Sequence, residues 1–217
     1  MPEEIQEWPR STRWIHAGFA LAVTLLLFSE LDMKAIWKKV GELPFRHLLF
    51  HMHMWIGMFA TVIVIAFWVQ VFSNKNLRSH LFPYRGPYLD NVCTDIRGLA
   101  NRKLPPSGMR GGVPGMVHAF GLAAVTGMAL LGFIMFFLIA NYGVAAPIGF
   151  YQLPKKMHDF LSSFVWLYWW GHIGMATLHA SKSPPFCAYS GRSNAILGWF
   201  TTPESTPEIL REQALPG

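Results

Sequence analysis

Nine histidines occur in this chain of 217 residues, and two of them share a helical face. His158 and His172 are 14 residues apart. At about 100° per residue their side chains lie about 40° apart around a helix axis. At about 1.5 Å per residue they are separated by about 21 Å along it. A neutral imidazole nitrogen is a good ligand for haem iron. The spacing therefore predicts two separate cofactor sites along one helix.

The composition indicates that this helix lies in a membrane. Apolar residues make up 52% of the chain and charged residues only 14%, against about 25% charged in an ordinary soluble domain. This excludes a disordered chain, a collagen and a disulfide scaffold. The two cysteines, Cys93 and Cys187, lie outside any C-x-x-C-H pattern, so a haem would be held without covalent bonds. The 18 Lys and Arg fall between apolar runs, which argues against nucleic acid as a partner.

Four apolar stretches are long enough to cross a bilayer, at about 20 residues per helix. The fold class expected is all-α, an integral membrane four-helix bundle over residues 1–182 with a cytoplasmic tail over 183–217. The first stretch also resembles a signal sequence, but Glu30 and Asp32 stand where a cleavage site would be needed, so a retained helix is predicted. The predicted spans are 14–33, 49–72, 116–140 and 158–180.

The distribution of basic residues predicts the orientation. Twelve of the 18 Lys and Arg lie in the N-terminal segment, the connection between spans two and three, and the tail. The positive-inside rule therefore places both termini in the cytoplasm. In that second connection, apolar residues recur at helical spacing and predict a short interfacial helix. These residues are Leu89, Val92, Ile96 and Leu99.

The topology offers each histidine of the fourth span a partner at its own depth. His16, at the cytoplasmic start of span one, is level with His172. His53, near the periplasmic start of span two, is level with His158. Two such pairs are what bis-histidine haem b requires, and iron ligated on both faces is suited to electron transfer. Small residues beside the histidines would let a macrocycle lie close to the backbone; they are Gly18, Gly57, Gly171 and Gly174.

The other histidines have simpler interpretations. A single His at a helix end usually contacts water or headgroups, and we assign that role to His47, His51 and His80. His51 remains a competitor of His53 as the ligand in span two, because the two side chains point about 200° apart. The run from His47 to Met54 mixes imidazole and thioether groups, which also suit copper, although Met is an ordinary filler of apolar surfaces.

These residues resemble the four-helix di-haem cytochrome b family related to bacterial cytochrome b-561. That family includes the membrane subunits of formate dehydrogenases and nickel–iron hydrogenases. The resemblance covers about residues 10–182. It is carried by Arg13-Trp-Ile-His16, by His53-Met-Trp-Ile-Gly57 and by the spacing His158, His172, His179. It implies two haem b groups, with His16 and His172 as ligands of the cytoplasmic-side haem and His53 and His158 as ligands of the periplasmic-side haem. It also implies a place in the bacterial inner membrane.

The resemblance further implies a quinone near the cytoplasmic-side haem, where the chain enters span three. There Arg110 and His118 are candidates to hydrogen-bond a quinone or relay a proton, with a headgroup anchor and a packing role as their ordinary alternatives. The Asn-Ala-Gly-Gln run of the formate dehydrogenase branch is absent, so its individual contacts cannot be transferred.

The function expected is electron transfer between a peripheral redox subunit, an iron–sulfur protein or a cytochrome, and the quinone pool. The alternatives are a free-standing di-haem oxidoreductase that takes electrons from superoxide or a cytochrome, and a His/Met metal transporter. Basic residues crowd the first periplasmic connection and suggest a docking face, although Glu30, Asp32 and Glu42 neutralise most of their charge. These basic residues are Lys34, Lys38, Lys39 and Arg46.

Overall fold

The computed structural model describes residues 9–33, 44–106, 108–142 and 149–182 of the chain. These residues form four long helices and three short elements. The long helices are α1 (Arg10–Glu30), α2 (Pro44–Ser73), α5 (Gly112–Tyr142) and α6 (Gln152–Lys182). The short elements are α3 (Lys75–Leu81), α4 (Pro87–Ala100) and the 3₁₀ turn η2 (Gly149–Tyr151). The predicted all-α membrane fold is confirmed. Three predicted spans lie within α2, α5 and α6, and the first, 14–33, extends three residues past the end of α1 at Glu30.

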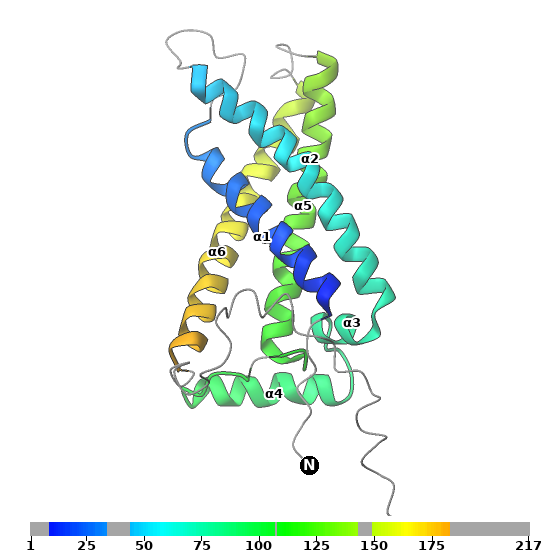
Figure 1. Cartoon of the computed structure of the whole chain (residues 1–217), viewed down its shortest axis with the longest axis vertical. Helices are drawn as coiled ribbons and strands as arrows, with labels where there is room; N and C mark the ends of the chain where they lie inside the picture. The colour runs from blue at the N-terminus through cyan, green and yellow to red at the C-terminus, as the bar shows by residue number, and fades with distance from the viewer. Residues whose placement is uncertain (1–8, 34–43, 107, 143–148, 183–217) are drawn as a thin grey trace, which may run out of the picture.

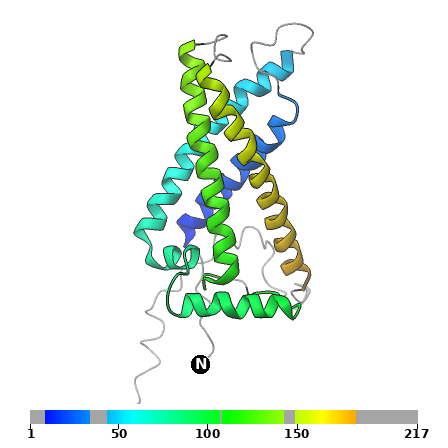
Figure 2. The same ribbon diagram turned by 180° about the vertical axis from the view of Figure 1, so that it is seen from behind.

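The long helices run up and down as a bundle, with α4 lying crosswise beneath them (Figure 1). The view from behind shows the same arrangement (Figure 2). The starts of α1 and α5 and the ends of α2 and α6 lie at the end of the bundle that also carries α3 and α4. We call this the α4 end, and the opposite end the η2 end.

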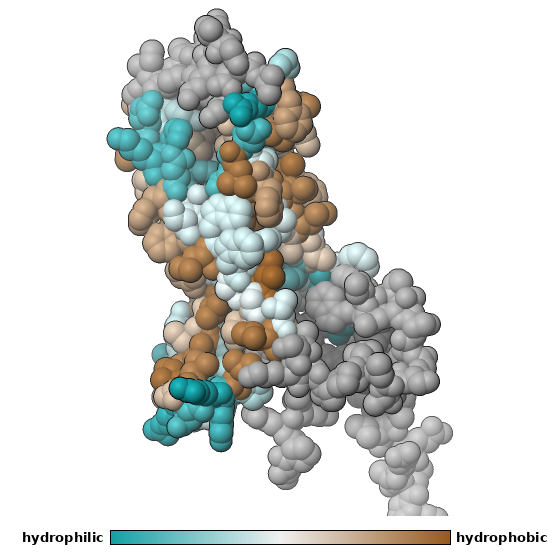
Figure 3. Space-filling model, turned by 90° about the vertical axis from the view of Figure 1, so that its left-hand side faces the viewer, coloured by the Kyte–Doolittle hydropathy of each residue, from teal (hydrophilic) through white to brown (hydrophobic). Residues whose placement is uncertain are grey.

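Three of the long helices contain a stretch that is long and apolar enough to cross a membrane, by length and composition alone. These are α1, α2 and α5. The fourth, α6, is 31 residues long, as α5 is, but Trp, Tyr, Ser and His interrupt its aliphatic residues. On the face seen in Figure 3, apolar and near-neutral side chains occupy the middle of the molecule and polar ones gather toward its ends. Exposed Leu167 and Trp170 of α6 fit a lipid-facing surface.

The long helices pack in the order α1 on α2, α2 on α5 and α5 on α6. Within the described ranges, α6 has no comparably close backbone packing with α1 or α2. Large side chains bridge α6 and α1 instead. Trp166 Nε1 donates to Glu30 Oε1 at 2.7 Å, and Trp169 Nε1 donates to Thr24 Oγ1 at 3.0 Å. The wider separation of these helices is what gives side chains on α6 room to face α1 and α2.

Two short helices, rather than the single one expected, connect α2 and α5. The predicted interfacial helix corresponds to α4, which begins at Pro87 after Gly86 adopts a positive φ of 60°. Of its predicted apolar stripe, Val92 is buried, whereas Leu89, Ile96 and Leu99 are exposed. The additional helix α3 is started by Asn74, whose side chain accepts from the backbone N–H groups of Asn76 and Leu77.

Candidate functional site

At the α4 end, the structure brings His16 of α1 to His172 of α6. The centres of the two imidazole rings are 6.0 Å apart, and the rings are tilted by 53°. Both side chains are partly buried. The two histidines are 156 positions apart in the chain. They face one another from α1 and α6, whose backbones do not pack closely.

At the η2 end, His53 of α2 faces His158 of α6 in the same way. Their ring centres are 6.4 Å apart with an interplanar angle of 68°. His53 Nδ1 lies 2.8 Å from the hydroxyl oxygen of Ser29 on α1. Its sequence neighbour His51 is exposed and contacts the ring of Phe50. Of the two histidines, His53 is thus the one that meets a histidine of another helix.

Both separations fit an iron ion held between two imidazoles. With a metal–nitrogen bond of about 2 Å on each side and about 1 Å from nitrogen to ring centre, bis-histidine ligation needs ring centres about 6 Å apart. Gly132 of α5 lies beside the His158 pair, where an added Cβ would stand 3.8 Å from His158 Nε2. A glycine there leaves the backbone open toward the nitrogen that would bind iron.

We compared the chain with known protein families. The model of the family described as prokaryotic cytochrome b561 matches residues 7–185. The chain belongs to the prokaryotic cytochrome b561 family. Comparisons with curated proteins and with solved structures gave no match. Membership implies that this multi-pass membrane protein binds haem b and takes part in electron transport.

Two further rings surround His172 in this cytochrome b561 family member. The phenol ring of Tyr168, one turn earlier in α6, is stacked on it with ring centres 5.3 Å apart. His118 of α5 meets it nearly perpendicularly at 5.1 Å, which is closer than an iron ion between two rings requires. Gly121 of α5 makes room for this arrangement, because a Cβ there would overlap the ring of Tyr168.

His80 is a functional candidate that the sequence reasoning missed. We predicted an interfacial side chain, but His80 is only 1% exposed. Its ring centre is 5.8 Å from that of His118, and its Nδ1 accepts the backbone N–H of Gly111 at 3.0 Å. Burial, and to a smaller extent the Arg110 guanidinium, lowers the pKa of His80 from 6.5 to about 4. The imidazole rings of His80, His118 and His172 form a continuous line from α3 to the α4-end pair.

His80 could not be found from its sequence position because the contacts that bury it come from distant residues. Gly115 of α5 lies directly against the His80 backbone, where a Cβ would overlap the His80 carbonyl oxygen. Gly111, whose φ of 75° suits glycine, presents the N–H that His80 accepts. The glycine-rich run before span three was the available signal, but nothing in the sequence linked it to α3.

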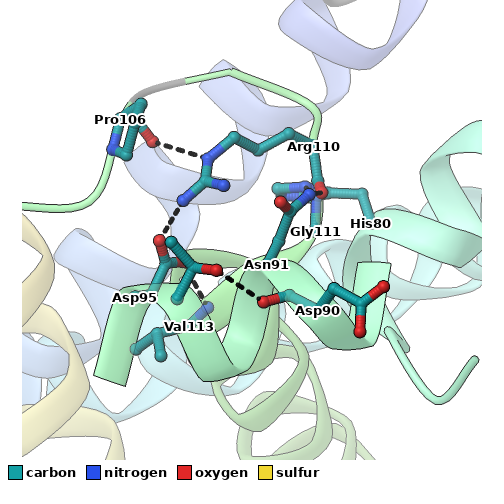
Figure 4. A network of polar contacts seen from close by, with 9 residues as sticks. His80, Asp90, Asn91, Asp95, Pro106, Arg110, Gly111 and Val113 are labelled. Atoms are coloured by element: carbon teal, nitrogen blue, oxygen red, sulfur yellow. Dashed lines mark hydrogen bonds and ion pairs between the residues drawn. The ribbon is translucent and has the colours of Figure 1, made fainter. Parts of the chain in front are cut away.

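Arg110, the other predicted quinone residue, is held in a polar network at the α4 end (Figure 4). Its guanidinium donates to Asp95 Oδ1 of α4 and, at 3.4 Å, to the Pro106 carbonyl. The second oxygen of Asp95 accepts the Val113 N–H at 3.0 Å, which caps the start of α5. Asn91 Nδ2 donates to the Arg110 carbonyl at 2.9 Å. We call these residues the α4 clasp, because they fix α4 beneath α5.

The structure corrects our interpretation of three glycines. A Cβ at Gly18 would meet Ile63 at 3.7 Å, and one at Gly57 would meet Leu26 at 3.9 Å. Both residues therefore belong to the packing between α1 and α2. Gly174 is about 200° around α6 from His172 and faces away from it. Gly171 lies in open space.

The predicted docking loop lies largely outside the described residues, because Lys34, Lys38 and Lys39 are not among them. The fourth basic residue, Arg46, forms an ion pair with Asp32 at 2.9 Å. This pair is the kind of local neutralisation that was the alternative to a docking face. The side chain of His179 and the tail over 183–217 also lie outside the described part of the chain.

The copper alternative loses its geometric basis in the described residues. His51 and Met52 are exposed, whereas Met54 packs on the cluster of Phe50, Ile139 and Tyr151. The imidazole and thioether groups of this run therefore face different surroundings. Among the residues that the structure describes, no group of three or more His, Cys, Asp or Glu side chains could hold a metal ion.

Proposed function

We propose that this cytochrome b561 family member holds two haem b groups, one between each histidine pair. His16 and His172 are the axial ligands at the α4 end, and His53 and His158 those at the η2 end. The observation that carries the proposal is the repetition of one geometry, with ring centres 6.0 and 6.4 Å apart, at two levels of α6. Haem b supplies one-electron redox chemistry when bound, and two filled axial positions favour electron transfer.

The two sites are stacked along the bundle. His158 and His172 are about 21 Å apart along α6, so each haem would occupy its own half of the membrane. Side chains from Trp166 and Trp169 fill the level between them and donate hydrogen bonds to α1. The protein thereby provides a transmembrane route for single electrons, with the α4 end predicted to face the cytoplasm.

A quinone is proposed to exchange electrons at the α4 end. Of the two sequence candidates, His118 is the better placed, because its ring contacts both His172 and His80. The Arg110 guanidinium is engaged by Asp95 and supports α4. The imidazole of His118 would donate a hydrogen bond to a quinone carbonyl beside the α4-end haem.

A peripheral redox subunit is the proposed second partner. Its docking on the connection over 34–43 rests on the sequence, since the basic residues there are outside the described ranges. Reversing Lys38 and Lys39 to Glu should then slow reduction of the η2-end haem by a co-purifying partner, more at low salt than at high salt. An unchanged rate and salt dependence would place docking on the opposite face.

Two measurements test the function: the absorption spectrum of the purified protein, and then the rate at which a quinol analogue reduces it. Purified full-length protein should contain two low-spin haems per chain, with sharp α-bands in the reduced state. A quinol analogue should reduce them, and His118→Ala should slow this reduction while both haems remain. A protein without haem would refute the proposal, and an unaffected rate in His118→Ala would move the quinone site elsewhere.

A further inference from the structure

Ser29 lies at the last turn of α1 and connects that helix to His53 of α2. Its hydroxyl oxygen is 2.8 Å from His53 Nδ1 and 2.9 Å from the carbonyl oxygen of Leu26. Ser29 is only 9% exposed, so water does not compete freely for these contacts. The hydroxyl is therefore a defined partner of one ring nitrogen of His53.

The two contacts together determine where the protons lie. A serine hydroxyl has one proton, and the Leu26 carbonyl can only accept. A Ser29 proton directed at Leu26 leaves the Ser29 oxygen to accept from His53. The Leu26 carbonyl is a second acceptor for the His53 ring, so both partners favour a proton on the nitrogen that faces them. His53 then carries its proton on Nδ1, and Nε2 keeps the free lone pair that a metal ion needs.

The neighbouring residue ties the same turn to the second ligand helix. Glu30 Oε1 accepts from Trp166 Nε1 at 2.7 Å and from Ser162 Oγ at 3.4 Å. Ser162 follows His158 by one turn of α6. Consecutive residues of α1 thus hold α2 through His53 and α6 beside His158, which fixes the two histidines relative to one another.

We propose that Ser29 is a positioning residue that sets the tautomer of His53 and lowers the reduction potential of the η2-end haem. The inference rests on the proposed function, because it takes His53 as an axial ligand. An acceptor on the distal N–H of a ligating histidine fixes the ring and raises the basicity of the ligand. A more basic ligand stabilises the ferric more than the ferrous state, which makes reduction less favourable.

The test is a spectroelectrochemical titration of the full-length protein with both haems bound. Ser29→Ala should shift the midpoint of the η2-end haem to more positive potential, with a change of up to about tenfold in its redox equilibrium constant, or about 59 mV for one electron. The α4-end haem should not shift. Ser29→Thr, which keeps the acceptor, should restore the lower potential. The midpoint that disappears in His158→Ala, which lacks the η2-end haem, is the one that belongs to that haem.

Two further variants separate the hydrogen bond from general loosening. Thr61→Val is the matched control, since the Thr61 hydroxyl donates only to the Gly57 carbonyl of its own helix, at 2.9 Å; it should leave both midpoints unchanged. Ser29→Cys keeps the size of the side chain with a weaker acceptor and covers the case in which Ser29→Ala loses the haem. A haem-loaded Ser29→Cys or Ser29→Ala protein with the original midpoint would overturn the inference. Wild-type protein without haem would instead refute the proposed function.

Discussion

At the η2 end, His53 meets the buried hydroxyl of Ser29, and the next residue of α1, Glu30, accepts hydrogen bonds from α6. At the α4 end, His172 meets the faces and edges of two other rings, Tyr168 and His118. A hydroxyl fixes a proton on one nitrogen, whereas ring contacts fix orientation without choosing a proton position. The difference suggests that the two histidine pairs are controlled differently. At the η2 end the proton position of His53 is fixed, whereas at the α4 end only the ring orientation of His172 is fixed.

Removing a ligand gives the largest effect and tests whether the two ends are independent. His53→Ala and His158→Ala should each lose the η2-end haem, and His16→Ala and His172→Ala the α4-end haem. The remaining haem should stay bound because it lies about 21 Å away along α6. Haem content and reduced spectra measure this. His51→Ala is the matched control and should keep two haems; loss of one there, with two kept in His53→Ala, would reverse the assignment in α2.

The next effect is confined to the α4 clasp. Asp95→Ala leaves the Arg110 guanidinium without its buried carboxylate and uncaps α5, which should cost about 3 kcal/mol of stability at this end. Thermal unfolding in detergent and proteolysis between α4 and α5 would detect it. Asp90→Ala, on the exposed side of α4, should behave like wild type. Equal melting of the Asp95→Ala and wild-type proteins would show that the clasp contributes little.

Lowering the pH should loosen the α4 end around His80. The pKa of His80 is lowered to about 4 in the folded protein, so its contribution is fully present above pH 6.5 and is lost as the pH falls toward 4. Between pH 7 and pH 5 the loss should be about 2 kcal/mol. Hydrogen exchange of the Gly111 amide measures it, with His80→Gln as the variant that cannot titrate. An identical pH response in His80→Gln would assign the effect to another group.

The smallest expected effect concerns the ring stack on His172. Gly121→Ala places a Cβ against Tyr168 and should displace it, at a cost of about 1 kcal/mol. The reduced spectrum of the α4-end haem should change slightly and that of the η2-end haem should not. Gly174→Ala is the control, because a Cβ there meets nothing within 4 Å. Equal changes at both haems would mean that the two ends share one packing unit.

The fold was largely accessible from the sequence because long apolar stretches and the spacing of histidines are local patterns. The four spans and α4 follow from them, and the facing of His16 toward His172 and of His53 toward His158 matches the depths expected of the spans. The start of α3 depends on one local capping residue, Asn74, which hydropathy does not register.

The surroundings of the histidines were not accessible because they arise from contacts between distant segments. From the sequence, Glu30 is simply a charged residue near the end of the first span, yet it accepts a hydrogen bond from Trp166 on another helix. His80 was expected to be an interfacial side chain, yet it is buried by Gly115 of α5 and by Gly111 just before that helix. Tertiary contacts of this kind leave no periodic signal along the chain.

The last helix of the described chain supplies one histidine of each pair. During synthesis α1, α2 and α5 leave the ribosome before α6, so a nascent chain at that stage carries His16 and His53 without His172 or His158. On the proposed ligand assignment, neither cofactor can be captured on both faces until α6 is translated, as far as His158 for the η2-end haem and as far as His172 for the α4-end haem. Haem binding then reports that α6 has been synthesised, since a chain truncated before α6 would lose both haems at once.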